Sequence, residues 1–142
     1  MVFRDKIKGM AALALFVSLL STATPLPAKE LECNINDGPC SVTSAQRTVT
    51  LNIEPKPVSP MQELSFTVTI SPCDRLPDKL LLDLSMPGMM MGKNQVTLQR
   101  TTGCTYKGKG VIVRCMSGRT LWQATLLSEL LDNPAFIFNV RK

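Results

Sequence analysis

The stretch Leu64-Ser65-Phe66-Thr67-Val68-Thr69-Ile70 decides the fold class of this chain. Apolar and polar residues alternate through it without interruption. Successive side chains of a β-strand point to opposite faces, so this alternation is typical of a strand with one buried face. β-branched and aromatic residues, which favour strands, occupy most of its positions. We therefore predict a strand over residues 62–71.

The same alternation recurs on both sides of this stretch, separated by segments rich in proline, glycine and asparagine. No helical period stands out after residue 28. We predict seven strands, over residues 46–54, 62–71, 79–86, 94–100, 104–115, 119–127 and 134–140. Short strands at this spacing indicate a seven-stranded immunoglobulin-like antiparallel β-sandwich. The core is expected to contain Phe66, Val68, Leu82, Leu84, Trp122 and Phe138.

The first residues have the layout of a secretory signal peptide. Arg4, Lys6 and Lys8 precede an apolar run over residues 10–20, and small residues and prolines lead to Ala28. That order predicts a signal peptide over residues 1–28 and a periplasmic protein. If the segment stayed uncleaved, it would instead anchor the protein in the membrane. The expected organisation is then a signal peptide (1–28), a cysteine-containing segment (29–45) and the sandwich (46–142).

Composition excludes several classes of function. The formal net charge of the whole chain is only +5, and the basic residues form no stripe accompanied by stacking aromatics. Nucleic-acid binding is therefore not expected. The chain contains no histidine, which excludes Ser-His-Asp and Cys-His catalytic sites. The carboxylates are not paired either, so we do not expect an enzyme, and no small-molecule substrate is evident.

The chain contains five cysteines, an odd number. In an oxidising compartment disulfides are expected, with one thiol left over. Neighbouring antiparallel strands at 62–71 and 104–115 would bring Cys73 beside Cys104, and the turn-rich segment between Cys33 and Cys40 would let those two pair. Cys115 would then remain free. The alternative joins Cys40 to Cys115 and leaves Cys33 free.

The methionine-rich segment Met86-Pro87-Gly88-Met89-Met90-Met91-Gly92 follows the predicted strand at 79–86. Pro87 suits the second position of a β-turn, and a type II turn would place Gly88 at positive φ. Thioether sulfur is a soft ligand that suits Cu(I). It is also flexible apolar filler for irregular gaps in a core.

The segments Met86-Pro87-Gly88-Met89, Met91-Gly92, Tyr106-Lys107-Gly108 and Ser117-Gly118 ahead of Trp122 resemble the YtkA-like family of small exported bacterial domains, which is related to the FixH-like proteins. The resemblance implies an immunoglobulin-like sandwich outside the cytoplasm, near metal transport or respiratory assembly. It implies no reaction and no catalytic residue. The family's methionine-containing turn corresponds to Met86, Met89 and Met91. Without histidine, a mixed His/Met copper site cannot form.

Strand alternation places the soft ligands at one end of the predicted sandwich. Consecutive antiparallel strands put alternate connections at the same end, so the segments after the first, third and fifth predicted strands should lie together. Met61 falls in the first of these segments. The predicted metal ligands fall in the other two and are Met86, Met89, Met90, Met91, Cys115 and Met116.

Two hypotheses follow for the function. In the first, the protein is a small extracytoplasmic binding protein that carries or buffers Cu(I), its only expected cofactor. In the second, it is a non-catalytic interaction module that docks on a membrane-bound respiratory or metal-transport complex, and the methionines plug the end of the core.

Overall fold

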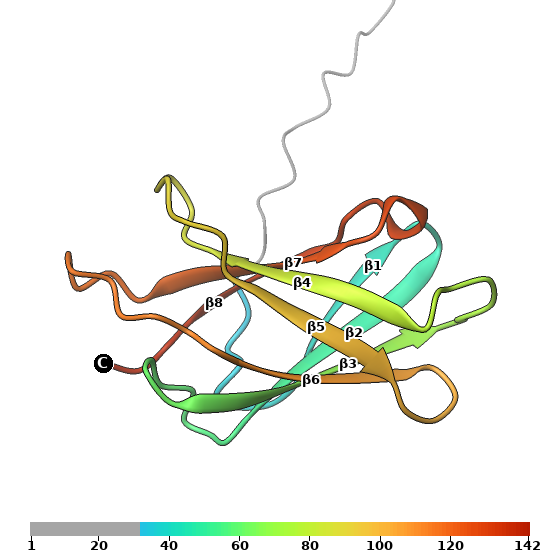
Figure 1. The fold of residues 1–142 in the computed structure, drawn as a ribbon, viewed down its shortest axis with the longest axis horizontal. Helices are drawn as coiled ribbons and strands as arrows, with labels where there is room; N and C mark the ends of the chain where they lie inside the picture. Colours follow the sequence, from blue (N-terminus) through green and yellow to red (C-terminus); the bar gives the residue numbers. More distant parts are fainter. Residues whose placement is uncertain (1–31) are drawn as a thin grey trace, which may run out of the picture.

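The structure is a computed structural model that describes residues 32–142. The predicted signal peptide lies outside the described residues. The described chain forms eight strands and one short 3-10 helix (Figure 1). In chain order these are β1 (Cys40–Ser44), β2 (Arg47–Glu54), β3 (Glu63–Ser71), β4 (Lys79–Ser85), β5 (Gln95–Arg100), β6 (Thr105–Val111), β7 (Leu121–Leu127), η1 (Glu129–Leu131) and β8 (Ala135–Asn139).

All strand pairs between these elements are antiparallel, and together they make one sheet in the order β1-β2-β3-β6-β5-β4-β7-β8. The sheet curls until its first and last strands approach each other, which gives a nearly closed, barrel-like molecule (Figure 1). The all-β antiparallel class is therefore confirmed. The expected pairing of β3 with β6 is also found, from Glu63 opposite Val111 to Thr69 opposite Thr105.

The predicted number of strands was wrong, because β1 forms within the segment 29–45 that we expected to precede the sheet. β1 pairs with β2 through a tight turn at Ala45 and Gln46, which both have positive φ, at 49° and 60°. Two-residue hairpin turns with positive φ at both positions usually contain Asn-Gly or Asp-Gly. Ala-Gln carries no such signal, and β1 offers only Cys40 and Val42 as apolar residues, so its pattern is weak.

A disulfide lies between the two edge strands of the sheet, β1 and β8. Cys33 donates its backbone N–H to the carbonyl of Ile137 in β8 at 2.7 Å, next to a parallel bridge between Glu32 and Ile137. Its sulfur is bonded to Cys40, the first residue of β1. The Cys33–Cys40 bond thus connects β1 to a segment paired with β8. This protects two sheet edges that would otherwise be open to pairing with other chains.

The core follows the period-two pattern. The residues expected inside the molecule are all at most 1% exposed: Phe66, Val68, Leu82, Leu84, Trp122 and Phe138. Leu81, which breaks the alternation, points outward and is 40% exposed. β6 packs closely against its neighbours through glycine. A Cβ on Gly108 would lie 2.3 Å from the carbonyl oxygen of Thr97, so no larger residue fits without moving the backbone.

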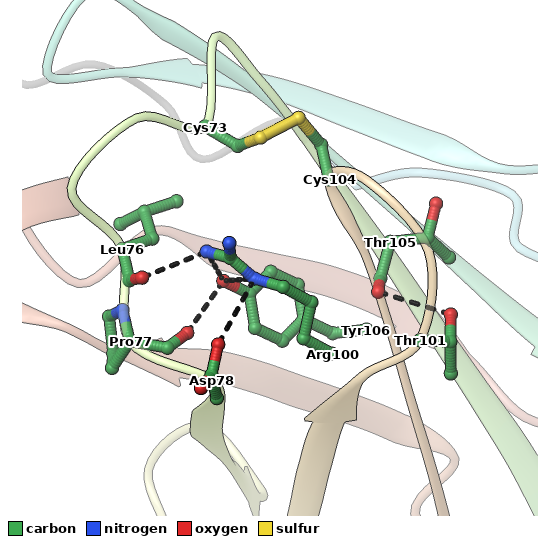
Figure 2. Close-up of polar contacts among 9 residues, drawn as sticks. All are labelled: Cys73, Leu76, Pro77, Asp78, Arg100, Thr101, Cys104, Thr105 and Tyr106. Atoms are coloured by element: carbon green, nitrogen blue, oxygen red, sulfur yellow. Dashed lines mark hydrogen bonds and ion pairs between the residues drawn. A yellow bond between two sulfur atoms is a disulfide. The ribbon is translucent and has the colours of Figure 1, made fainter.

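A second disulfide, Cys73–Cys104, joins the β3–β4 and β5–β6 connections at one end of the molecule (Figure 2). Both disulfides are those expected from the sequence. Cys115 is the free cysteine of the described residues, so the alternative Cys40–Cys115 bridge is not formed.

Beside the Cys73–Cys104 bond, a polar cluster ties the same two connections together (Figure 2). Arg100 donates to the carbonyl of Leu76 at 2.8 Å and to the hydroxyl of Tyr106 at 2.7 Å. The Tyr106 hydroxyl in turn donates to the carbonyl of Pro77 at 2.7 Å. The buried phenol therefore has both a donor and an acceptor partner, as a buried hydroxyl requires. A disulfide and a set of paired polar groups therefore hold these two connections together.

Candidate functional site

The opposite end of the molecule gathers the soft ligands. The β2–β3, β4–β5 and β6–β7 connections lie together at this end, with the C-terminal segment, and the β3–β4 and β5–β6 connections lie at the other (Figure 1). The β2–β3 connection is fastened to the end of β6 by a hydrogen bond from the N–H of Met61 to the carbonyl of Ile112, at 2.8 Å. We call this end, formed by residues 55–62, 86–94 and 112–120, the sulfur pole.

The β4–β5 connection begins with a tight turn. The N–H of Met89 donates to the carbonyl of Met86 at 3.1 Å, and Gly88 has a φ of +75°. The positive φ predicted at this position is therefore confirmed, and it suits glycine because a side chain with a Cβ is strained there. The turn reverses the chain directly after the buried Met86 and raises Met89 to the surface.

Cys115 and Met89 are brought into contact at the sulfur pole. They lie 26 residues apart on different connections, and the Cys115 Sγ lies 3.7 Å from the Met89 Sδ. The thioether can only accept in this contact, because it carries no proton. Met89 is 37% exposed and Cys115 is half-buried, so both sulfurs are open to solvent while their backbones are held by turns.

The surroundings of Cys115 favour its thiolate. The Ser117 Oγ lies 2.9 Å from its Sγ, and this hydrogen bond is the main cause that lowers the pKa of the Cys115 thiol. The backbone of Ser117 and the backbone and charge of Arg119 lower the pKa further. A turn holds these residues in place, because the N–H of Gly118 donates to the carbonyl of Cys115 at 3.0 Å. A lowered thiol pKa increases reactivity and metal affinity near neutral pH.

The remaining predicted ligands differ widely in their exposure. Met86 is 4% exposed and belongs to the core, as its parity in the strand suggested, and Met91 is half-buried against that core. Met90 and Met116 are fully exposed, each at the tip of its own connection. The structure therefore brings Met89 and Cys115 together, while Met90 and Met116 stand free in solvent near them.

Sequence reasoning missed Ser117 as a partner of the thiol. It is an ordinary residue in a turn, and only its spacing of two from Cys115 could have pointed to it. Within residues 32–142, no group of three or more His, Cys, Asp or Glu side chains is arranged to hold a metal ion. A metal at the sulfur pole would therefore depend on methionine.

No family model, curated protein or solved structure matches this chain. The resemblance to the YtkA-like family accordingly rests on the sequence motifs quoted above. Among the described residues, no helix has the length and apolar character needed to cross a membrane.

The lowered thiol pKa gives a testable expectation for alkylation. Because only the thiolate reacts, the rate of Cys115 alkylation by iodoacetamide should reach half its plateau at a lower pH than the rate of the same thiol in the unfolded chain. Ser117→Ala removes the main stabilising hydrogen bond and should move that midpoint to higher pH. Mass-spectrometric rate measurements across pH check this. An unchanged midpoint in Ser117→Ala would show that the hydrogen bond does not set the pKa.

Proposed function

We propose that this protein is a small extracytoplasmic Cu(I)-binding protein that carries or buffers the metal at the sulfur pole. The observation that supports this most directly is the 3.7 Å separation of Cys115 Sγ and Met89 Sδ. At a typical metal–sulfur distance of about 2.3 Å, two sulfurs this far apart subtend an angle of roughly 107° at a shared ion. That angle is close to the tetrahedral value, so the separation of the two sulfurs is compatible with both binding one Cu(I) ion.

The set of ligands supports a soft metal. Thiolate and thioether ligands select Cu(I), whereas Zn(II) prefers thiolate and imidazole nitrogen. The chain contains no histidine, so it has no imidazole to offer. Met91 is half-buried against the core, and the exposed Met90 and Met116 adjoin Met89 and Cys115 in the chain, so these three are the further thioethers proposed to complete the coordination. Met86 is part of the core and would support the turn from below.

The proposed location is the periplasm, reached through the signal peptide over residues 1–28. Two disulfides support an oxidising environment. In such an environment a free thiol is unusual, and a ligand role would account for Cys115.

We also propose that the curled sheet is a flattened sandwich of immunoglobulin-like type. The β5–β6 ladder contains two residue pairs, Gln99–Lys107 and Arg100–Tyr106, whereas every other ladder contains at least five. This short ladder divides the strands into a β1-β2-β3-β6 group and a β5-β4-β7-β8 group. The resemblance to the YtkA-like family is part of the same proposal.

A competition titration tests the copper proposal. The protein with Cys115 as a free thiol and both disulfides intact should take one equivalent of Cu(I) from a chromogenic chelator under anaerobic conditions. Cys115→Ser and Met89→Leu should each weaken the retention at least about tenfold, which corresponds to losing roughly 1.4 kcal/mol. Replacing Met89, Met90 and Met91 together with leucine should abolish it.

Met61→Leu is the matched control, because Met61 is 64% exposed at the same end, and the side-chain hydrogen bonds of Cys115 go to Met89 and Ser117 instead. It should leave retention unchanged. Equal retention by the wild-type protein and the triple leucine variant would refute the site.

A second candidate function is favoured by a separate observation. Met90 and Met116 are fully exposed on neighbouring connections, and exposed apolar side chains at one end of a small domain are typical of a contact surface. In this alternative the protein is an interaction module for a membrane-bound respiratory or metal-transport complex. The triple leucine variant separates the two candidates, since leucine would preserve an apolar contact surface and destroy a metal site.

A further inference from the structure

A cavity of about 370 Å³ lies at the sulfur pole, and Cys115 and Met116 of the proposed metal site are among the residues that line it. Its walls come from the β2–β3 connection, the β6–β7 connection and the C-terminal segment after β8. Two backbone hydrogen bonds fix the C-terminal wall: the N–H of Val140 donates to the carbonyl of Thr120 at 3.0 Å, and that of Arg141 to the carbonyl of Val58 at 2.8 Å. The cavity is therefore bounded by ordered backbone.

The interior of the cavity is mostly apolar. Trp122 and Val140, which are 1% and 6% exposed, contribute to its lining together with Val113 and Pro60. Cavities of this volume with such linings are the usual size for small-molecule sites. Val113, which is 41% exposed, offers apolar surface that a ligand could remove from water.

The charged residues that line the same cavity are all cations. They are Arg114, Arg119, Arg141 and Lys142. No acidic side chain lines the cavity, and the two ion pairs found within residues 32–142, Arg100–Asp78 and Lys109–Glu63, lie elsewhere. Four cationic side chains in the lining, with no carboxylate side chain among them, make the electrostatic potential of the cavity favourable for an anion.

We propose that this cavity binds a small amphipathic anion, a molecule with an apolar body and a single carboxylate-like group. The apolar body would cover the lining around Trp122, and the anionic group would lie among the arginines, whose guanidinium groups suit carboxylates. The site goes beyond the proposed copper function: Cys115 and Met116 also line the cavity, but the apolar residues and the cations that would hold the anion are not copper ligands, and Met89 does not line it. The sequence does not reveal this cavity, because its four cations come from two segments that are far apart in the chain.

Trp122 is the only tryptophan of the chain, so its fluorescence reports on this cavity without interference. Titrating the protein with decanoate below its micelle concentration should give a saturable change in emission. Decanol, which has the same chain length and no charge, should need at least a tenfold higher concentration for the same change. Raising the salt concentration should weaken decanoate binding, because exposed charges are screened.

Substitutions at the cavity and away from it test where decanoate binds. Arg119→Gln combined with Arg141→Gln should weaken decanoate binding at least tenfold. Arg75→Gln combined with Lys79→Gln removes the same charge from exposed positions at the opposite end and should have little effect. Met89→Leu removes a proposed copper ligand that does not line the cavity, so this variant should bind decanoate as the wild type does, which separates this site from the copper site.

Three results would overturn the proposal. They are a change in emission that never saturates, a response to decanol at the same concentration as to decanoate, and equal weakening by the two double variants.

Discussion

Replacing Phe66 with alanine is expected to lower the free energy of unfolding by about 3–5 kcal/mol. Phe66 is completely buried on β3, where it lies opposite Ile53 of β2 on one side and Gly108 of β6 on the other. Its ring also lies within van der Waals reach of the space that a Cβ on Gly110 would occupy. The loss combines the transfer free energy of the ring with the cavity left among neighbours that the strands hold in place. Denaturant unfolding measures it as a lower midpoint at an unchanged slope.

Leu81→Ala is the matched control for that experiment. Leu81 is also an apolar strand residue, but it is 40% exposed on the outer side of β4. We expect its loss to cost under about 1 kcal/mol, because surface substitutions change stability little. If Phe66→Ala cost no more than Leu81→Ala, the strand register described here would be wrong, since a slip of one residue exchanges the two faces.

Removing the Cys73–Cys104 disulfide by replacing both cysteines with serine should cost about 3–4 kcal/mol in the loop-entropy account of cross-links. The two cysteines are separated by 31 positions and join the β3–β4 and β5–β6 connections. Without the bond, these connections would be held by the Arg100–Tyr106 cluster and by backbone hydrogen bonds such as that from Ile70 to Cys104. The unfolding midpoint of the double variant should fall accordingly.

The other cysteines give graded comparisons. Cys33 and Cys40 are separated by only 7 positions, so replacing both should cost less, about 2.5 kcal/mol by the same account. Cys115→Ser removes no cross-link and should change stability by less than about 0.5 kcal/mol. A larger loss for Cys115→Ser than for the Cys73 and Cys104 pair would contradict the pairing.

The sequence predicted those parts of the fold that depend on local pattern. Alternation marked the buried residues of β3, such as Phe66, and proline with glycine marked the turn at Gly88 with its positive φ. It missed β1, because the Ala45-Gln46 turn uses residues that seldom adopt positive φ. The pairing of the segment around Cys33 with β8 could not be predicted either, since it depends on a backbone contact with Ile137, far along the chain.

For the candidate site, the alternation of connections sufficed to place the methionines and Cys115 at one end. The finer arrangement was not accessible from the pattern. Which methionine meets Cys115 depends on how two turns are oriented in space, and the structure selects Met89. The hydrogen bond from Ser117 and the cationic cavity likewise depend on side-chain positions that no periodicity records.

X-ray absorption at the copper edge of the protein loaded with one equivalent of Cu(I) tests the central claim most directly. The account predicts a first coordination shell of sulfur alone, at about 2.3 Å, the typical metal–sulfur distance. In Met89→Leu combined with Cys115→Ser, that sulfur shell should be lost. A wild-type spectrum dominated by nitrogen or oxygen ligands, or a protein that keeps no copper after desalting, would contradict the account.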